Sequence, residues 1–266
     1  MKIWENINIS NINRLKQRAD FKLYDNVSAA LDNRKKQSSK NLNGVWKFLF
    51  LDAPEYSPEG LFEKSSDTSD WDNITVPGNW QMQGYGKMHY SDLWYNFPIN
   101  PPYVPSLNPT GIYKRLFSVP ESWKNERIIL KFHGVDSAFH VYLNGREAGY
   151  SKGARYEAEF DITDYIVPNK ENELTVRVYQ WSDGTYLEDQ DMWWLSGIFR
   201  DVEIYSEPFD SIEDILITTD LDENYTDSML NVSVNFRGNV QGCTVNYLLF
   251  DDRNNEILNI DNDING

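Results

Sequence analysis

Residues 181–201 read W-S-D-G-T-Y-L-E-D-Q-D-M-W-W-L-S-G-I-F-R-D and combine acidic with aromatic side chains at close spacing. Sugars present hydroxyls that carboxylates hydrogen-bond and apolar C–H faces that lie against aromatic rings, so sugar sites use both residue types together. The segment therefore indicates a sugar-binding surface. The alternative is a rim of core aromatic residues surrounded by solvated carboxylates. The residues concerned are Asp183, Glu188, Asp189, Asp191 and Asp201 with Trp181, Tyr186, Trp193, Trp194 and Phe199.

Two of these carboxylates have a spacing that suits a glycosidase. Asp189 and Asp191 stand two positions apart, and in a strand two such residues lie on the same face. Glycoside hydrolysis uses a pair of carboxyl groups several Å apart, one as acid and one as nucleophile or base. The spacing alone admits that assignment, and it also admits two carboxylates without a catalytic role.

The composition limits the classes of partner. The chain has 266 residues and a formal net charge of −16, whereas nucleic acids and anionic membranes bind basic surfaces. We therefore expect neither as a partner, while a neutral ligand tolerates this charge. Cys243 is the single cysteine, the first residues lack an apolar leader, and no stretch has the length of a membrane-spanning helix. These features predict a cytoplasmic protein.

Short strands separated by turn signals dominate the pattern. Trp46, Phe48 and Phe50 stand on alternate positions, which is typical of a strand with one buried face, and Asn144-Gly145 suits the type I′ turn of a hairpin. The proline-rich stretches 100–105 and 108–111 are expected to be loops, because proline lacks an N–H and restricts the residue before it. The whole pattern predicts an all-β fold built on a jelly-roll sandwich. Further strands are predicted at 74–76, 112–119, 128–132, 139–143, 174–178 and 202–204.

The pattern divides the chain into three parts. Residues 1–40 are expected to form an extended arm with one helical turn near 28–33, and residues 41–206 the jelly roll. Residues 207–266 contain three predicted strands, at 212–218, 230–236 and 245–250. An immunoglobulin-like sandwich needs about seven strands, so we expect this last part to be an incomplete immunoglobulin-like domain.

Several motifs, in order, resemble the family 2 glycoside hydrolases of the large bacterial β-galactosidase type. The resemblance covers nearly all of residues 4–205. It implies an arm, a jelly-roll sugar-binding domain and the start of an immunoglobulin-like domain, with a catalytic TIM barrel following in the whole enzyme. The motifs are V-P-G-N-W-Q-M at 76–82, N-P-P-Y-V-P at 100–105, N-P-T-G at 108–111, G-V-D-S-A-F at 134–139, N-G at 144–145, E-F-D at 159–161 and the 181–201 segment.

The resemblance assigns the site residues. Both catalytic glutamates of the family belong to the barrel, in an N-E motif preceded by W-G that does not occur in this sequence, so no catalytic residue is expected in this chain. By its match within D-Q-D-M-W, Asp191 is implied to bind galactose hydroxyls and to ligate a sodium ion, completed by residues outside this chain. Asp92 falls where related enzymes carry a galactose-contacting Asn, so a similar substrate contact is expected there.

A structural magnesium site of the family is broken in this sequence. Asn6 and Asp183 match ligand positions, but Ile3 and Lys152 occupy two others. We expect the ammonium of Lys152 to pair with Asp183 and replace the metal, so the magnesium ligands of the full-length enzyme are not in this chain. The histidines His89, His133 and His140 lack metal-ligand spacing and are expected to be hydrogen-bonded residues of strands or loops.

The sequence thus favours the N-terminal sugar-binding region of a retaining β-galactosidase, inactive without its barrel. The expected partners are a β-galactoside substrate, the remaining domains and, for the full-length enzyme, further copies of itself. The alternatives are a non-catalytic carbohydrate-binding module and a complementing or structural fragment. A reading frame that continues past Gly266 into a barrel would discriminate between them.

Overall fold

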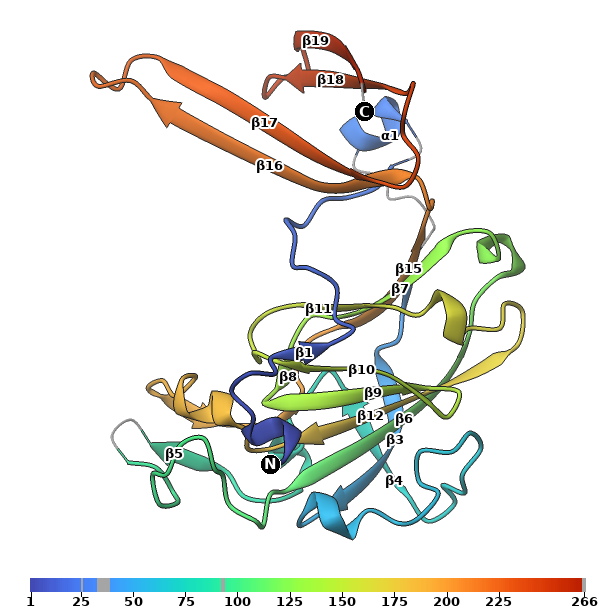
Figure 1. The fold of residues 1–266 in the computed structure, drawn as a ribbon, viewed down its shortest axis with the longest axis vertical. Coiled ribbons are helices and arrows are strands. Elements are labelled where there is room, and N and C mark those ends of the chain that lie inside the picture. The colour runs from blue at the N-terminus through green and yellow to red at the C-terminus, as the bar shows by residue number, and fades with distance from the viewer. Residues whose placement is uncertain (25, 33–38, 92–93, 265–266) are drawn as a thin grey trace. The chain divides into compact units, whose positions relative to one another are not determined.

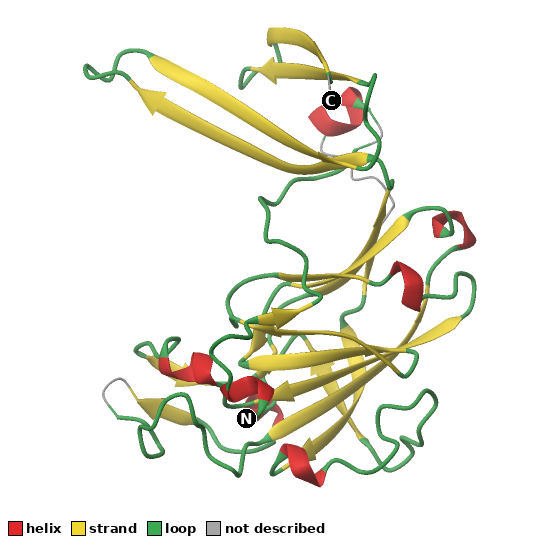
Figure 2. Cartoon of the chain, viewed as in Figure 1, coloured by secondary structure: helices red, strands yellow, loops and turns green. Residues whose placement is uncertain are grey.

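The computed structural model describes residues 1–24, 26–32, 39–91 and 94–264, and its chain divides into two compact units. The first unit contains residues 1–17 and 39–206, and the second contains residues 18–38 and 207–266. The residues expected to form a single arm are thus shared between the units. Strands joined by loops dominate both units (Figure 2), so the predicted all-β class is confirmed. No helix in the described ranges has the length and apolar character needed to cross a membrane.

The first unit is a sandwich of two antiparallel sheets (Figure 1). One sheet contains, in spatial order, β1 (Asn11–Ile12), β10 (Arg146–Lys152), β9 (Ala138–Leu143), β12 (Glu171–Tyr179), β6 (Thr110–Ser118), β3 (Gly44–Leu51) and β4 (Asp72–Val76). The other contains β11 (Ala158–Asp161), β7 (Arg127–Phe132), β15 (Val202–Glu207) and β2 (Ser39–Asn41). Two small pairs are β5 (His89–Ser91) with β13 (Met192–Trp194) and β8 (Val135–Asp136) with β14 (Gly197–Ile198).

Short helical turns connect the strands. Only α1 (Val27–Leu31), which overlaps the range 28–33 predicted for a helical turn, is α-helical among the described residues. Asn26 caps it, because its side chain accepts a hydrogen bond from the backbone of Ala29. The 3₁₀ turns are η1 (Ile3–Glu5), η2 (Pro54–Tyr56), η3 (Gln81–Gln83), η4 (Glu121–Trp123), η5 (Thr163–Tyr165) and η6 (Asp183–Tyr186).

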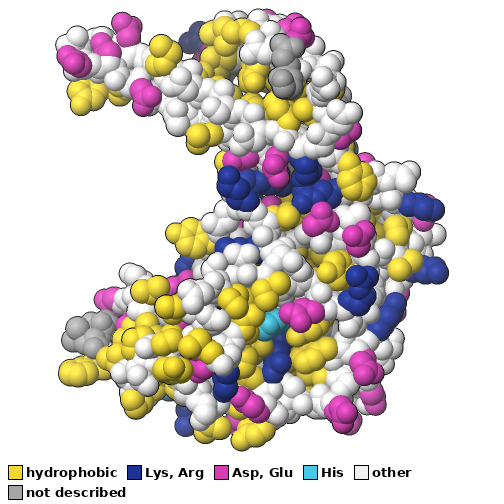
Figure 3. Space-filling model, in the orientation of Figure 1, with side chains coloured by type: hydrophobic (Ala, Val, Ile, Leu, Met, Phe, Trp, Pro, Cys, Tyr) yellow, Lys and Arg dark blue, Asp and Glu magenta, His cyan; other side chains and the backbone are white. Residues whose placement is uncertain are grey.

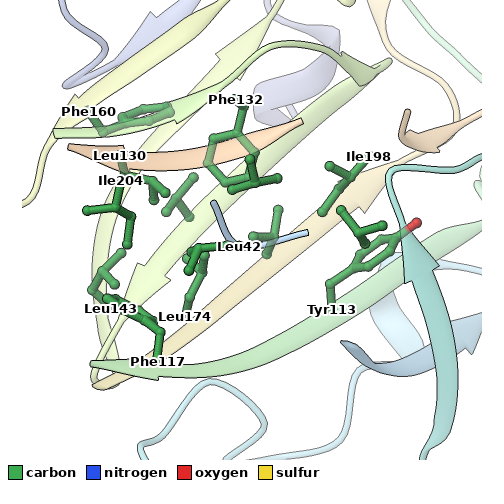
Figure 4. Close-up of a cluster of buried hydrophobic side chains, with 14 of the residues drawn as sticks. Leu42, Tyr113, Phe117, Leu130, Phe132, Leu143, Phe160, Leu174, Ile198 and Ile204 are labelled. Carbon is green, nitrogen blue, oxygen red and sulfur yellow. The ribbon is translucent and has the colours of Figure 1, made fainter. Parts of the chain in front are cut away.

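The core lies between the two sheets, where large apolar side chains from both meet (Figure 4). The alternation predicted over 44–50 is observed, since Trp46 and Phe48 are buried. Strand β7 is instead buried along its whole length. Its core-facing residues alternate with Arg127 and Lys131, which are covered because they pair with Asp161 at 2.5 Å and Glu157 at 2.7 Å.

The hairpin turn between β9 and β10 is confirmed. Asn144 and Gly145 both have positive φ angles, 50° and 82°, as a type I′ turn requires. A Cβ at Gly145 would lie 2.8 Å from the backbone nitrogen of Lys64, so glycine also permits a close approach of two chain segments.

The expectation of a loop over 108–111 was wrong for its second half. Thr110 and Gly111 begin β6, which lies between β12 and β3 inside the large sheet. Proline removes only its own N–H, and Pro109 stands immediately before the strand, where its carbonyl accepts a hydrogen bond from Gln180 at 2.9 Å. Gly111 is required by packing, because a Cβ there would lie 2.8 Å from the rings of Phe48 and Trp80.

The second unit contains two antiparallel hairpins. The first joins β16 (Ser211–Leu221) to β17 (Ser228–Arg237), and the second joins β18 (Thr244–Phe250) to β19 (Glu256–Asp263). Three of these strands match the predicted ones, whereas β19 falls in a polar stretch that was not predicted as a strand. Among the described residues of this unit only Ala29 and Glu207 are buried, and apolar side chains of its strands such as Leu230 and Val232 are exposed.

Candidate functional site

The 181–201 segment starts where β12 ends, and a buried amide holds its first residue. The side chain of Asn108 accepts a hydrogen bond from the backbone N–H of Trp181 at 2.8 Å. The same amide donates to the Trp181 carbonyl at 2.8 Å. Asn108 is fully buried, so these two bonds satisfy both ends of its amide and fix the direction in which the segment leaves the sheet.

Aromatic side chains within and beside the segment pack into a cluster. Trp181 and Trp194 meet edge to face with ring centroids 5.4 Å apart, and Phe97 contacts both. The hydroxyl of Tyr186 donates to the carbonyl of Tyr103 at 2.6 Å, which ties η6 to the proline-rich loop. The interpretation of the aromatic residues as a rim of core residues is thus correct for Trp181 and Trp194, which are buried.

Other aromatic residues of the same region are exposed. Trp193 and Tyr90 lie opposite each other on β13 and β5, with ring centroids 5.6 Å apart. Their exposed fractions are 53% and 52%. Apolar side chains gather on the surface over β5 and the neighbouring η6 (Figure 3). Large exposed aromatic side chains beside polar groups are typical of binding surfaces.

Asp191 lies at this exposed aromatic surface. Its carboxylate accepts a hydrogen bond from the hydroxyl of Tyr90, and the residue is exposed. The second carboxylate oxygen is available for a hydroxyl donor or a cation. Tyr90, Asp191 and Trp193 therefore present a phenol, a carboxylate and an indole together, which is the combination that a sugar ring requires.

The two aspartates of the D-Q-D sequence do not share an environment. Asp189 accepts a hydrogen bond from the indole N–H of Trp194 at 2.8 Å and lines a pocket that Asp191 does not line. Both residues lie before β13 in irregular chain, so the spacing rule for strands does not apply to them. This separation argues against the two aspartates acting as one acid and nucleophile pair.

The remaining predicted site features differ in outcome. Asp92 lies outside the described residues. At Asp191 the chain provides one carboxylate, which is a suitable hard ligand for sodium but is not a complete site. No cluster of three or more histidine, cysteine, aspartate or glutamate residues that could hold a metal occurs within the described ranges.

The predicted pair between Lys152 and Asp183 is confirmed. The Lys152 ammonium lies 2.7 Å from both carboxylate oxygens of Asp183 and 3.0 Å from the carbonyl oxygen of Asn6. The two side chains are 10% and 8% exposed. The ammonium contacts the oxygen atoms that a cation would need, so the residues present do not fit a magnesium ion at this position.

Two histidines of the first unit are hydrogen-bonded, as predicted. His140 contacts the hydroxyl of Tyr179 at 2.9 Å, and burial, reinforced by the charge of Arg177, lowers the pKa of His140 to about 4. His133 lies 2.8 Å from Glu157. The neighbouring Glu203 raises the pKa of His133, with a smaller contribution from Glu157.

Two functional contacts were not predicted from the sequence. Asn108 bonds a residue 73 positions away, and Tyr90 bonds a residue 101 positions away. Asn108 was recognised only as part of an N-P-T-G motif. Asn108 lies at the start of the predicted loop 108–111, and no local pattern in the sequence pointed to either contact.

Comparison with known proteins identifies the family. Residues 39–208 match the glycosyl hydrolases family 2, sugar binding domain. The chain is 43% identical over 248 residues to the β-galactosidase of Psychromonas ingrahamii, covering 93% of this chain and 24% of that protein. It is 47% identical over 231 residues to the β-galactosidase of Photobacterium profundum, covering 86% of this chain and 22% of that protein. The chain thus spans about a quarter of the length of these curated relatives.

Solved structures agree on the fold. A β-glucuronidase from an uncultured Clostridium species superposes with a TM-score of 0.65 at 24% identity, over 92% of this chain and 40% of that one. Bacteroides uniformis β-glucuronidase 2 gives a TM-score of 0.66 at 20% identity, over 85% and 26%. These similarities concern the β-sandwich architecture. With the family match over 39–208 and these relatives, the chain belongs to glycosyl hydrolase family 2, whose sugar-binding domain its first unit contains.

Proposed function

We propose that this chain is the sugar-binding region of a β-galactosidase that hydrolyses terminal non-reducing β-D-galactosides with retention of configuration. The observation that carries the proposal is the 43–47% identity to β-galactosidases over most of the chain. The exposed group of Tyr90, Asp191 and Trp193 supports it, because it offers sugar hydroxyls an acceptor and sugar C–H faces a ring.

The same proposal extends to the metal ions and the other parts of the enzyme. The catalytic glutamates, the magnesium ligands and the residues that complete a sodium site belong to parts of the enzyme outside this chain. Sodium would supply a hard cation for sugar hydroxyl oxygens, and Asp191 would hold it by one carboxylate oxygen. The full-length enzyme is cytoplasmic and homo-oligomeric. Asp92 makes a second substrate contact.

We expect the isolated chain not to hydrolyse a chromogenic β-galactoside above background. Glycoside hydrolysis requires two carboxyl groups across one bond, and Asp189 and Asp191 have different partners and surroundings. The measurement is a colorimetric assay of purified chain. Turnover that survives purification and disappears in Asp189→Asn or Asp191→Asn would contradict the expectation.

In the enzyme that contains this chain, Asp191→Asn should reduce kcat/KM. The variant keeps the side-chain shape but loses a charged hydrogen-bond acceptor, and such a loss costs about 1.5–3 kcal/mol, or roughly 10- to 150-fold. Activation by sodium should weaken as well. Steady-state kinetics at varied sodium concentration measures both effects.

Asp189→Asn provides the matched control, because this carboxylate is two residues away and bonds the Trp194 indole. Asp189→Asn should leave the dependence of kcat/KM on sodium concentration unchanged. An Asp191→Asn variant with normal kcat/KM and normal sodium response would show that Asp191 is structural.

A further inference from the structure

The chain that follows β4 runs antiparallel to the chain that follows β13, and the two form an interrupted ladder. The backbone N–H of Gly78 donates to the carbonyl of Ile198 at 2.8 Å, and that of Trp80 donates to the carbonyl of Ser196 at 3.1 Å. Further along, β5 pairs with β13 in the same antiparallel sense. Residues 81–88 lie between these two paired stretches, so the ladder has a gap there.

The side chain of Gln81 bonds across this gap. Its Oε1 accepts a hydrogen bond from the backbone N–H of Ser196 at 2.9 Å. Because the carbonyl of Ser196 already accepts from Trp80, both polar backbone groups of Ser196 are held. Gln81 and Ser196 are both buried, where a backbone N–H without a partner would be costly. A side-chain amide thus replaces the backbone partner that the gap removes.

Gln81 lies on a firmly anchored turn, η3. Trp80, immediately before the turn, is fully buried in the core between the sheets. At the end of the turn, the side-chain amide of Gln83 accepts from the backbone N–H of Thr75 at 2.8 Å and donates to its carbonyl at 3.0 Å. Thr75 belongs to β4 of the seven-stranded sheet. The support that carries Gln81 is therefore fixed to the core.

The ladder that Gln81 extends is short. Strands β5 and β13 contribute three residues each, and such a two-stranded ladder is only marginally stable by itself. Trp194 is buried and Trp193 is exposed, so a slip of one residue would exchange their sides. It would also separate Asp191 from Tyr90. The register of β13 therefore decides whether the surface formed by Tyr90, Asp191 and Trp193 exists.

The effect of Gln81 should be local. Its side-chain nitrogen is buried and has no hydrogen-bond partner among the described residues. The cost of burying this unpaired group offsets part of the benefit of the bond to Ser196. A methionine of similar volume would lose the bond but would also remove the unpaired group. Its consequences should therefore be concentrated in the chain that Gln81 bonds, with little change in the stability of the whole unit.

We propose that Gln81 is a positioning residue that sets the register of β13 against β5. Through Ser196 it holds Asp191 and Trp193 in the geometry in which they contact the substrate. The register depends only on the contacts described above. The contact with substrate rests on the function proposed above, so the two parts are tested separately.

Amide hydrogen exchange of the 266-residue chain tests the register. Gln81→Met should accelerate exchange at Ser196 and along β13 roughly 5- to 50-fold, because a buried N–H loses its partner and the short ladder opens more often. Exchange in β12 should not change. The matched control is Met82→Leu, since Met82 is the next residue of the turn and is exposed.

Three results would overturn the register assignment. The first is normal exchange along β13 in Gln81→Met. The second is equal acceleration in β12 and β13, which would show a loss of global stability instead of a local effect. The third is a Gln81→Met chain that does not fold, because the assignment requires a local effect.

Steady-state kinetics of the enzyme that contains this chain tests the contact with substrate. Gln81→Met should raise KM for a β-galactoside about 3- to 30-fold, because misplaced Asp191 and Trp193 bind the sugar less well. A mere loss of folded protein would lower the apparent kcat and leave KM unchanged. In an Asp191→Asn/Trp193→Ala background, Gln81→Met should have much less effect on kcat/KM, because the contacts that it positions are already lost.

An unchanged KM in Gln81→Met, or a full effect in the Asp191→Asn/Trp193→Ala background, would reject the positioning role toward substrate. Failure of the proposed function gives a different result. In that case Asp191→Asn by itself leaves kcat/KM normal, while the exchange measurement still decides whether Gln81 sets the register of β13.

Discussion

Replacing Lys152 with methionine should lower the free energy of unfolding by about 3–5 kcal/mol, because it leaves the buried carboxylate of Asp183 without its counter-charge. The ammonium has three oxygen contacts, two on Asp183 and one on the carbonyl of Asn6. Methionine retains the apolar stem and removes only the charge and the hydrogen bonds. Loss of these contacts should also release the N-terminal residues, where the ring of Trp4 stacks on that of Tyr179 with centroids 4.3 Å apart.

Denaturant unfolding monitored by tryptophan fluorescence measures the effect. The matched control is Lys124→Met, which breaks an exposed pair with Glu121 at 3.3 Å and should cost less than about 1 kcal/mol. The double variant Lys152→Met/Asp183→Asn should be less destabilised than the sum of its single variants. A wild-type protein that loses stability in a chelator would show that a metal, not the ammonium, holds this site.

Lowering the pH from about 6.5 to about 4 should remove about 3 kcal/mol of stability through His140 alone. The unfolded chain takes up a proton near pH 6.5, but the buried imidazole does so only near pH 4. The unfolded state therefore binds more protons in this range. The contribution of neutral His140 is fully present above pH 6.5 and is lost as the pH falls through that window.

Unfolding free energies measured across this range, in the wild type and in His140→Gln, isolate the contribution. The variant should show a shallower loss of stability toward acid. His133→Gln is the matched control of opposite sign, because the raised pKa of His133 means that its contribution is present at low pH and lost as pH rises. An NMR titration in which the His140 ring protonates near pH 6.5 would contradict the prediction.

The periodic parts of the fold could be predicted locally. Alternation over 44–50 predicted β3, and the Asn144-Gly145 pair predicted the hairpin between β9 and β10, because side-chain period and turn geometry depend on neighbouring residues. The all-β class followed from many such local signals. The polar strand β19 was missed, since alternation between apolar and polar residues was the signal used.

One ion pair was also predictable, from residues at positions that match the ligand positions of the family. A lysine in place of a metal-binding residue, with an aspartate retained at a second ligand position, was enough to predict the pair between Lys152 and Asp183. That inference required the family resemblance, since no local pattern links positions 31 residues apart.

Only the tertiary structure decided what surrounds the carboxylates of the 181–201 segment. Asp189 and Asp191 are equivalent by spacing, yet one bonds the Trp194 indole beside a pocket and the other bonds Tyr90 at the surface. The sequence by itself determined the longer strands with a clear apolar period, the family and the acidic and aromatic composition of the site. The pairing of β13 with β5 and the bond from Asn108 to Trp181 join residues distant in the chain. Such contacts depend on how all the strands pack together, so a local pattern does not specify them.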